Sequence, residues 1–349
     1  MTGNKAVANH HFTDQFENLQ IMYEKIRVIE PLVTEDLQKN IQEKGTKLTG
    51  LEYASKTSSS IEDKINREMA KDPETIPEDY LMQMKDLIRY TEIDDYHNLI
   101  PSAKETIKNL EAQGYVLSGI KNYYIKPYET TGYMGLHLNF VSPYGQEIEY
   151  QVHSEESFQA KQDGHKLYEQ IRTSVLDKDK DRLIKEILEI HGRAPIPPDY
   201  ETLPDYKMEP SKKQALIDLR RSRMDVDIDI SDDAKSMVYD ISCDGERIYH
   251  GFEHKFTDGS LWAYRNNDKS GTSVLHSLSN EGDEIAKNGI KAIHPSLEQL
   301  QKEAQLQEKK HTKWIEKNLP DIDDRDDVSK GANRTDEKTI SAMQLDFTH

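Results

Sequence analysis

Cysteine is almost absent from this chain. Its single cysteine, Cys243, allows neither an intramolecular disulfide nor a zinc site built from cysteine. The chain also lacks an apolar core of signal-peptide type near its start, and no run approaches the roughly 20 apolar residues that span a membrane. We therefore expect a cytoplasmic protein that does not bind membranes, while export without a cleaved signal stays open.

Basic residues are scarce relative to acidic ones. The 349 residues include 46 Lys and Arg against 64 Asp and Glu, which gives a formal net charge of −18. Proteins bind nucleic acids and anionic membranes largely through basic patches. The charge balance therefore argues against general nucleic-acid binding, although it leaves room for a local basic groove that could take a tRNA 3′ end.

Hydrophobic periodicity predicts an α/β architecture over the first half of the chain. Apolar residues at steps of three and four indicate helices, and strict alternation with polar residues indicates strands. We expect helices at 12–45, 101–113, 155–173 and 177–191, and strands at 115–123, 136–141 and 147–153. These elements predict a mixed sheet flanked by helices.

After residue 193, a run of prolines and two Asp-Gly dipeptides indicate a different domain organisation. Five prolines in 194–210 indicate a semi-rigid connector. Asp244-Gly245 and Asp258-Gly259 separate short alternating segments, which indicates a small antiparallel sheet. We expect four regions: a domain with an N-terminal helix at 1–193, a Pro-rich connector and short helix at 194–224, a small β-rich domain at 225–300, and a polar helix with an acidic mobile tail at 301–349.

The strand predicted at 147–153 is the first place where chemistry is expected. Alternation puts four polar residues on one face, namely Glu147, Glu149, Gln151 and His153. Mg²⁺ is bound by one or two carboxylates together with substrate phosphates, so this face can hold a metal–nucleotide complex. A half-buried strand with a solvated polar face explains the same pattern without a function.

Two further clusters contain lysine. Between Lys56 and Lys64, a Ser-rich helix start presents backbone N–H groups to phosphate, or is simply a capped helix. Residues 121–137 combine lysines, tyrosines and a glycine turn, which can contact phosphates and stack on a purine, or can pack over the core. No Gly-rich Walker loop is present, which excludes a P-loop kinase.

The order of these segments resembles the synthetase domain of the RelA/SpoT family, over residues 45–175. That family transfers pyrophosphate from ATP to the 3′-hydroxyl of a guanine nucleotide. The most specific part is Gly132-Tyr133-Met-Gly-Leu-His137 followed by Glu149-x-Gln151. The other matching segments are Lys56-x-x-x-Ser60-Ile-x-x-Lys64, Asp86-Leu-Ile-Arg89 and Lys121-Asn-Tyr.

The resemblance implies a nucleotidyltransferase-like fold and a role for each matched residue. Asp86 and Glu149 are the implied catalytic residues, and they are also the implied ligands of Mg²⁺, the cofactor. Tyr133 is expected to stack on the acceptor base. The remaining substrate-binding residues are expected to be Lys56, Ser60, Lys64 and Arg89, with Lys121, His137 and Gln151 supporting the acceptor.

The sequence departs from the family pattern at three places. Ala54 stands where an ATP-contacting arginine is expected, and His153 stands where a second arginine follows the Glu-x-Gln pair. Asp86 and Arg89 are also closer together than in the family. The first two changes remove positive charge from a polyphosphate site. The candidates to replace this charge are Arg67, Arg89 and Lys126.

Two classes of function therefore stay open from the sequence. An enzyme would transfer pyrophosphate to GDP or GTP, or alternatively to an adenine nucleotide or a tRNA 3′ end. The variant motifs resemble a branch found in toxins and in proteins of phages and mobile elements. The other class is a catalytically silent protein of such an element that still binds nucleotide or serves a structural role. Residues 225–300 match nothing in the family pattern and are expected to bind a protein partner or an antitoxin.

Overall fold

A computed structural model describes residues 12–16, 18–173, 177–231, 235–255 and 261–277. The chain divides into two compact units. Of the described residues, the first unit comprises those in 12–227 and 241–247, and the second comprises those in 228–240 and 248–277. The polar helix and tail expected at 301–349 lie outside the described residues. Within the described part of the chain, no helix has the length and apolar character needed to cross a membrane.

The helices at the start of the first unit are shorter than the periodicity predicts. The helix expected over 12–45 is interrupted before Pro31, because proline lacks the N–H of the helical ladder and favours the first turn of a new helix. Gly45 ends this segment with a φ of 71°, which glycine adopts without strain. The resulting elements are η1 (Asp14–Phe16), α1 (Leu19–Arg27), α2 (Glu30–Lys44), β1 (Lys47–Thr49) and η2 (Leu51–Tyr53).

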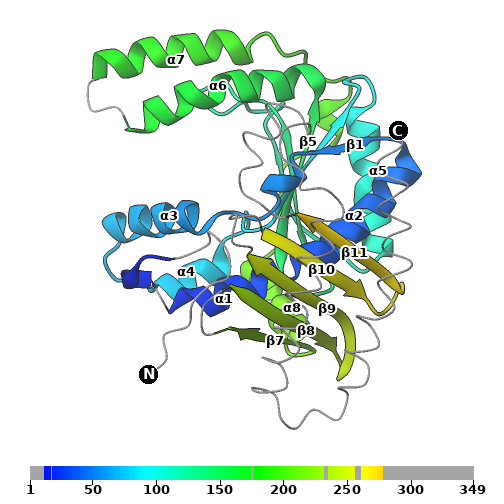
Figure 1. The fold of residues 1–349 in the computed structure, drawn as a ribbon. Helices are drawn as coiled ribbons and strands as arrows, with labels where there is room; N and C mark the ends of the chain where they lie inside the picture. Colours follow the sequence, from blue (N-terminus) through cyan, green and yellow to red (C-terminus); the bar gives the residue numbers. More distant parts are fainter. Residues whose placement is uncertain (1–11, 17, 174–176, 232–234, 256–260, 278–349) are drawn as a thin grey trace, which may run out of the picture. The chain divides into compact units, whose positions relative to one another are not determined.

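A six-stranded mixed sheet forms the centre of the first unit (Figure 1). Its strand order is β1-β2-β5-β4-β3-β6, in which β2 and β5 run parallel and all other neighbours run antiparallel. The strands not yet given are β2 (Arg89–Asp94), β3 (Val116–Asn122), β4 (Leu136–Val141), β5 (Glu147–Ser154) and β6 (Tyr206–Lys207). The predicted fold class, a mixed sheet flanked by helices, is confirmed.

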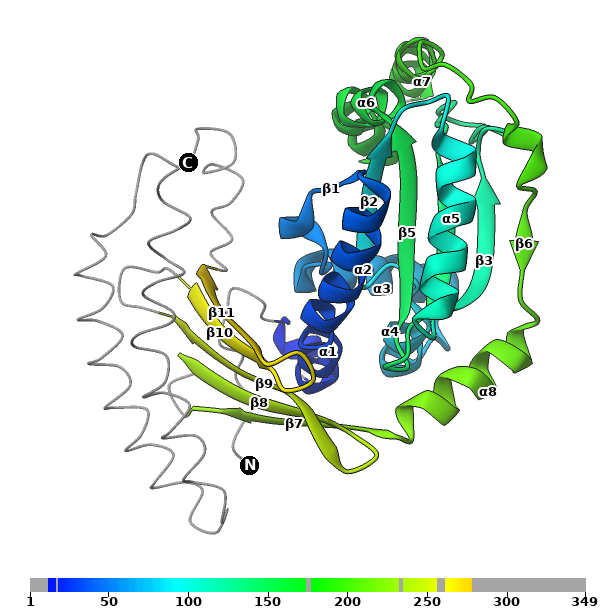
Figure 2. The same cartoon turned by 90° about the vertical axis from the view of Figure 1, so that its right-hand side faces the viewer.

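One face of this sheet is covered by α2 and α5 (Leu99–Ala112), as Figure 2 shows. Leu138 and Tyr150 are completely buried on it. The hydroxyl of Tyr90 donates to the backbone carbonyl of Glu30 in α2 at 3.2 Å. The sheet and these two helices therefore enclose the core of the unit, and this face is closed to a substrate.

The opposite face carries polar side chains in two rows across the strands. In the first row the register aligns Lys121, His137, Gln151 and Thr91. In the second row it aligns Gly119, Asn139, Glu149 and Arg89. Directly opposed residues on neighbouring strands lie roughly 5 Å apart, so the rows join residues that are distant in the sequence. This face is the polar one that alternation predicts for β5.

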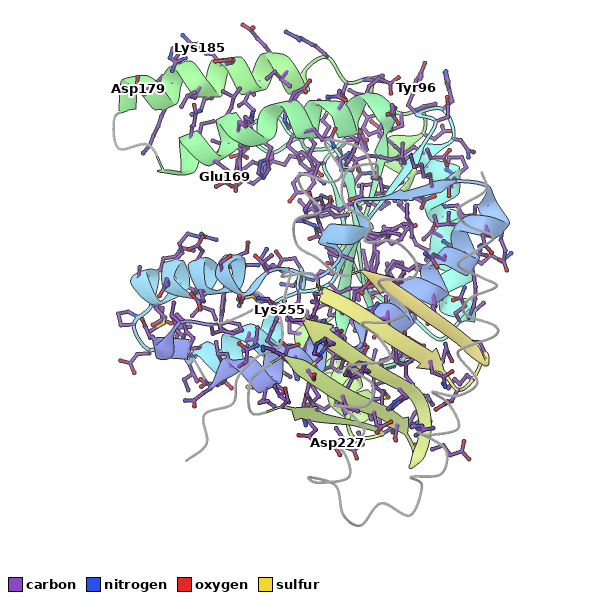
Figure 3. All side chains as sticks on the ribbon, viewed as in Figure 1. Tyr96, Glu169, Asp179, Lys185, Asp227 and Lys255 are labelled. Carbon is purple, nitrogen blue, oxygen red and sulfur yellow. The ribbon has the colours of Figure 1, made fainter. Side chains whose placement is uncertain are left out.

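Four helices complete this part of the unit, namely α3 (Ser58–Lys71), α4 (Pro77–Gln83), α6 (Glu155–Thr173) and α7 (Asp177–His191). The α6 helix follows β5 directly and packs against α7. In α7 the apolar Leu183 and Ile187 are buried, whereas charged side chains such as Asp179 and Lys185 project outward (Figure 3). The α7 helix is therefore amphipathic, as its spacing predicts.

The Pro-rich segment and its short helix are built into the first unit. Strand β6 pairs with β3. In α8 (Pro210–Arg221), the ammonium of Lys213 forms an ion pair with Glu147 at 2.8 Å. The guanidinium of Arg220 donates to three backbone carbonyls, those of Gly114, Val141 and Ser142, at 2.6–2.9 Å. These contacts attach β6 and α8 to the first unit, and α8 is the short helix expected within 194–224.

The second sheet has the order β11-β10-β9-β8-β7. Its hairpin at Asp244-Gly245 has positive φ at both turn residues, 54° and 82°, as a tight Asp-Gly hairpin requires. The small β-rich region expected in 225–300 therefore contains a sheet, whereas Asp258-Gly259 falls outside the described residues. The strands are β7 (Met224–Ile230), β8 (Ser236–Cys243), β9 (Glu246–Lys255), β10 (Leu261–Asn267) and β11 (Thr272–Ser277).

Candidate active site

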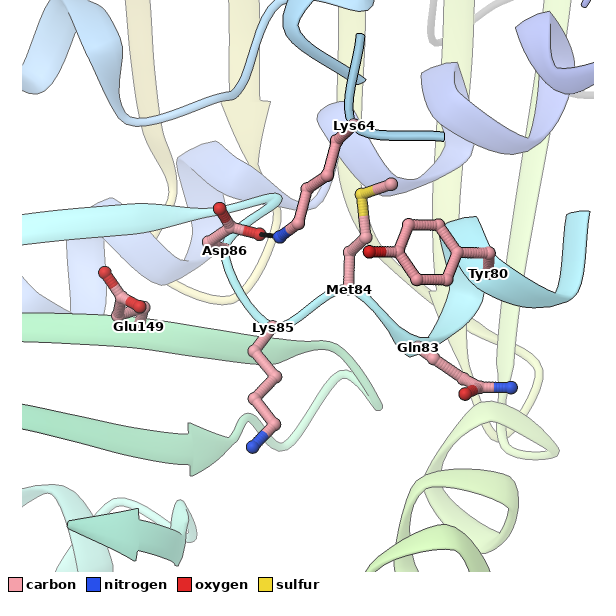
Figure 4. A pocket seen from close by; sticks show the side chains of 7 residues that line it. All are labelled: Lys64, Tyr80, Gln83, Met84, Lys85, Asp86 and Glu149. Atoms are coloured by element: carbon pink, nitrogen blue, oxygen red, sulfur yellow. Dashed lines mark hydrogen bonds and ion pairs between the residues drawn. The ribbon is translucent and has the colours of Figure 1, made fainter. Parts of the chain in front are cut away.

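Asp86 is held between two lysines that flank the start of α3. A backbone bridge between Ser55 and Ile88 brings Lys56 beside Asp86, and Lys64 reaches it from the second turn of the helix. The two ammonium groups lie 3.1 and 2.6 Å from different oxygens of the carboxylate (Figure 4 draws the Lys64 contact). Burial would raise the pKa of Asp86, but the charges of both lysines outweigh it and lower the pKa.

A pocket of about 310 Å³ contains both residues that the resemblance implies to be catalytic. Asp86 and Glu149 line it together with Lys64, and Tyr80 and Met84 line its other side (Figure 4). The carboxylates come from different parts of the fold, since Asp86 precedes β2 and Glu149 lies within β5. Two carboxylates and an ammonium in one pocket form a suitable environment for a metal-bound phosphate.

Glu149 is ionised and tightly surrounded. Its carboxylate accepts a hydrogen bond from the Gln151 side chain and lies 3.7 Å from Nδ1 of His137. Burial would raise the pKa of Glu149, but His137, Arg89 and Gln151 together lower it well below its usual range. A carboxyl group with such a low pKa is a weak base, so these surroundings suit a metal ligand or a hydrogen-bond acceptor better than a general base.

Tyr133 lies at the centre of a cluster of aromatic and imidazole rings. Its hydroxyl is 2.7 Å from Nε2 of His137 and 2.9 Å from Nε2 of His153. Its ring is 5.4 Å from the ring of Tyr123 and 5.7 Å from that of His191, measured between centroids. The cluster fixes the orientation of Tyr133 and connects it, through His137, to Glu149.

His153 contributes a neutral group to this cluster. Its side chain is fully buried, and burial, followed by the charge of Lys161, holds the pKa of His153 well below its usual range. Nδ1 of the ring lies 3.0 Å from the hydroxyl of Ser157. His153 therefore does not supply the positive charge of the arginine that the family pattern has at this position.

Lys121 occupies the end of the first row, where it pairs with the Pro-rich segment. Its ammonium is hydrogen-bonded to the carboxylate of Asp205, which also accepts from the backbone N–H of Asn122 at 2.8 Å. The ammonium lies 5.6 Å from the ring centre of Tyr123. Lys121 thus reaches the aromatic cluster, but its charge is shared with a carboxylate of the chain itself.

The structure brings most of the predicted site residues together, with three exceptions. Ser60 is exposed, and its backbone N–H is occupied by the capping hydroxyl of Thr57 at 3.3 Å. Arg67 is exposed on α3. Lys126 is fully exposed and pairs with Glu129 at 2.9 Å. Of the three candidates to replace the missing arginine charge, only Arg89 lies on the polar face, in register with Glu149.

Three residues near the site were not identified as site residues from the sequence. Asp205 pairs with Lys121 across 84 positions of sequence, so no local pattern indicates it. Asn139 stands beside Glu149 in the register, and its side-chain oxygen is buried without a hydrogen-bond partner in the described structure. Lys161 donates to the side-chain oxygen of Gln151, and the helix predicted over 155–173 did not by itself point to this residue.

The donor set fits Mg²⁺. Within the described residues, no group of three or more His, Cys, Asp or Glu side chains gathers as a self-contained metal site. Mg²⁺ needs only one or two carboxylates, because waters and substrate phosphates complete its shell. Asp86 and Glu149 in one pocket meet that requirement, and Lys64 lines the same pocket.

Comparisons with known proteins show a distant likeness. No family model and no curated protein matches this chain. The chain is similar to small alarmone synthetase 1 from Bacillus subtilis, at 17% identity and a TM-score of 0.37, over 52% of this chain and 92% of that one. It is also similar to a chain of the complex between the Type VI effector Tas1 and its immunity protein, at 17% identity and a TM-score of 0.35, over 50% of this chain and 95% of that one.

A third similar structure is a GTP pyrophosphokinase family protein from Streptococcus pneumoniae, at 15% identity and a TM-score of 0.36. The match extends over 60% of this chain and 98% of that one. The function proposed below is argued from the side chains of this chain.

Proposed function

We propose that this protein transfers the pyrophosphate group of ATP to the 3′-hydroxyl of a guanine nucleotide, GDP or GTP. The observation that carries the proposal is the position of Glu149 between two different environments. On one side it shares a pocket with Asp86 and Lys64. On the other side it contacts His137, which is hydrogen-bonded to Tyr133 in the ring cluster. The pocket can take the phosphates of one nucleotide, and the ring cluster can take the base of another. A carboxylate between them is therefore placed where a group would pass from one nucleotide to the other.

The donor would occupy the lysine side of this arrangement. Lys56 and Lys64 would bind phosphate oxygens, and Asp86, once they release it, would hold Mg²⁺ together with Glu149. Mg²⁺ supplies charge neutralisation to the phosphates when bound. The 3′-oxygen of the acceptor attacks the β-phosphorus of ATP. The bond between that phosphorus and the α,β-bridging oxygen breaks, and AMP leaves. The hydroxyl proton passes to solvent, and Glu149 orients that hydroxyl by accepting its hydrogen bond.

The acceptor would occupy the ring cluster. Tyr133 offers a ring for base stacking, and its hydroxyl is held by two imidazoles, so its position is fixed before substrate binds. Burial, followed by the charge of Glu149, keeps the pKa of Tyr133 well above its usual value, so the hydroxyl stays protonated. Lys121 and Gln151 lie in the same row of the sheet and would contact polar groups of the acceptor.

Replacing Tyr133 tests the acceptor side. For Tyr133→Ala we expect the acceptor KM to rise about 5- to 150-fold, because base stacking contributes roughly 1–3 kcal/mol. The KM for ATP should change little. Tyr133→Phe retains the ring and should retain most of the acceptor affinity. Steady-state kinetics with each substrate varied separately measures both values. Equal losses for both substrates, together with a lower melting temperature, would show that Tyr133 is only a packing residue.

Transfer of label tests the reaction itself. The purified protein is incubated with Mg²⁺, ATP labelled at the γ-phosphate, and one acceptor at a time: GDP, GTP, an adenine nucleotide or tRNA. We expect label on GDP or GTP. Label only on the adenine nucleotide or on tRNA would reject the guanine acceptor while keeping the transfer chemistry.

A catalytically silent nucleotide-binding protein is the second candidate. It is favoured by one observation: both oxygens of Asp86 are occupied by the chain's own lysines. If this arrangement persists with nucleotide bound, Asp86 cannot serve as a metal ligand. ATP binding by calorimetry without label on any acceptor would support this second candidate.

A further inference from the structure

Lys161 is directed back toward the polar face by the start of α6. The helix begins where β5 ends, and Ser154 and Ser157 cap it reciprocally, with the backbone N–H of each bonded to the other's hydroxyl at 3.0 and 3.1 Å. Ser157 faces His153 of β5. Lys161 lies one helical turn further along, so it shares the face of α6 that looks toward the strand.

A chain of side-chain contacts connects Lys161 with Glu149. The ammonium of Lys161 donates to the Gln151 oxygen, and the amide nitrogen of Gln151 donates to Glu149. These two contacts fix both ends of the amide. They leave Lys161 with hydrogen atoms that can still be donated, and they hold its charge next to the carboxylate implied to be catalytic.

Arg89 and Lys161 form a pair of like charges beside Glu149. The guanidinium of Arg89 makes no hydrogen bond or ion pair with the described part of the chain. Burial lowers the pKa of Lys161 to about 8; the charge of Arg89 adds to this, whereas Glu149 opposes it. The other lysines of the site each have a carboxylate partner: Lys56 and Lys64 share the single charge of Asp86, and Lys121 pairs with Asp205. Two partly buried cations near a single carboxylate favour an additional anion between them.

We propose that Lys161, together with Arg89, binds the polyphosphate of the donor nucleotide and supplies the positive charge that His153 does not. The inference rests on the proposed function for the identity of the anion. Its substrate class is a nucleoside triphosphate, recognised through its charge and its β- and γ-oxygens rather than its base. Lys161 is thus a substrate-binding residue contributed by the helix that follows the catalytic strand.

Binding of two adenine nucleotides tests this proposal independently of turnover. The probes are α,β-methylene-ATP, which keeps the polyphosphate but cannot transfer it, and AMP, which lacks the β- and γ-groups. Each is titrated with Mg²⁺ into the whole protein by calorimetry. Lys161→Met should weaken binding of the triphosphate analogue about 10- to 100-fold, as expected for the loss of one charge-assisted contact. AMP affinity should change less than twofold.

Three further variants separate charge from packing. Lys161→Gln retains a donor for Gln151 without the charge, and it should lose affinity as Lys161→Met does. Lys161→Arg should retain most of the affinity. Lys166→Met removes an exposed lysine from the same helix and should bind like the unchanged protein.

Several outcomes would overturn the inference. These are an unchanged affinity of Lys161→Met for the triphosphate analogue, full affinity of Lys161→Gln, a parallel loss of AMP binding, or an unchanged protein that binds the analogue no more tightly than AMP. The transfer reaction is judged separately. If the analogue binds in a Lys161-dependent way but no acceptor gains label, the proposed function fails and the role of Lys161 stands.

Discussion

Glu149→Gln should lower turnover by at least about a hundredfold, as removal of one oriented electrostatic or hydrogen-bonding group at a reaction centre commonly does. The substitution is nearly isosteric, so the strand should remain intact. It removes the negative charge that His137 and Arg89 stabilise, and with it one of the two carboxylates of the proposed Mg²⁺ site. Initial rates at saturating ATP and acceptor measure the effect, and thermal unfolding checks the fold.

The matched control for this variant is Glu156→Gln, which removes an exposed carboxylate at the start of the neighbouring α6. Its turnover should equal that of the unchanged protein. A Glu149→Gln protein that retains substantial activity would contradict the assignment of this residue. A large drop in melting temperature would instead assign it a structural role.

Lys44→Met should lower the free energy of unfolding by about 3–5 kcal/mol, because it leaves a buried carboxylate without its cation. Lys44 and Glu92 form an ion pair at 2.5 Å, with side chains only 2% and 0% exposed. The Glu92 carboxylate also accepts hydrogen bonds from Thr106 and Tyr150, at 3.2 and 2.7 Å. The pair lies on the core face of the sheet, so the effect should appear in stability rather than in substrate binding.

Urea unfolding of Lys44→Met and of a control, Lys39→Met, measures this effect. Lys39 lies on the same helix, and its side chain is 60% exposed, so its loss should change stability by less than about 1 kcal/mol. Adding Glu92→Gln to Lys44→Met removes the unpaired charge and should recover part of the loss. Similar unfolding midpoints for Lys44→Met and Lys39→Met would mean that the pair contributes little.

Hydrophobic periods of two residues for strands and 3.6 residues for helices were sufficient to predict the central sheet and its polar face. Alternation in 147–153 placed Glu149, Gln151 and His153 on one side, and the structure has them there. The same reasoning interpreted residues 12–45 as one helix, because it followed apolar spacing and gave no weight to Pro31. Local periodicity thus identified elements better than it identified their ends.

Contacts between distant segments could not be predicted in this way. Lys44 pairs with Glu92 across 48 positions of sequence, and Asp205 pairs with Lys121 across 84 positions. No period relates such partners, since register and helix packing bring them together. The Pro-rich segment shows the same limit, because its composition gave no sign that Tyr206 and Lys207 pair with β3 at the edge of the sheet.

The fate of the α- and γ-phosphates of ATP, followed in parallel samples, tests the central claim most directly. The protein is given Mg²⁺, GDP or GTP, and ATP labelled in parallel samples at the α- or the γ-phosphate. Transfer of pyrophosphate predicts that the α-label appears in AMP and the γ-label on the guanine nucleotide, in equal amounts. Label released as free phosphate or pyrophosphate, or ADP formed in place of AMP, would contradict the account.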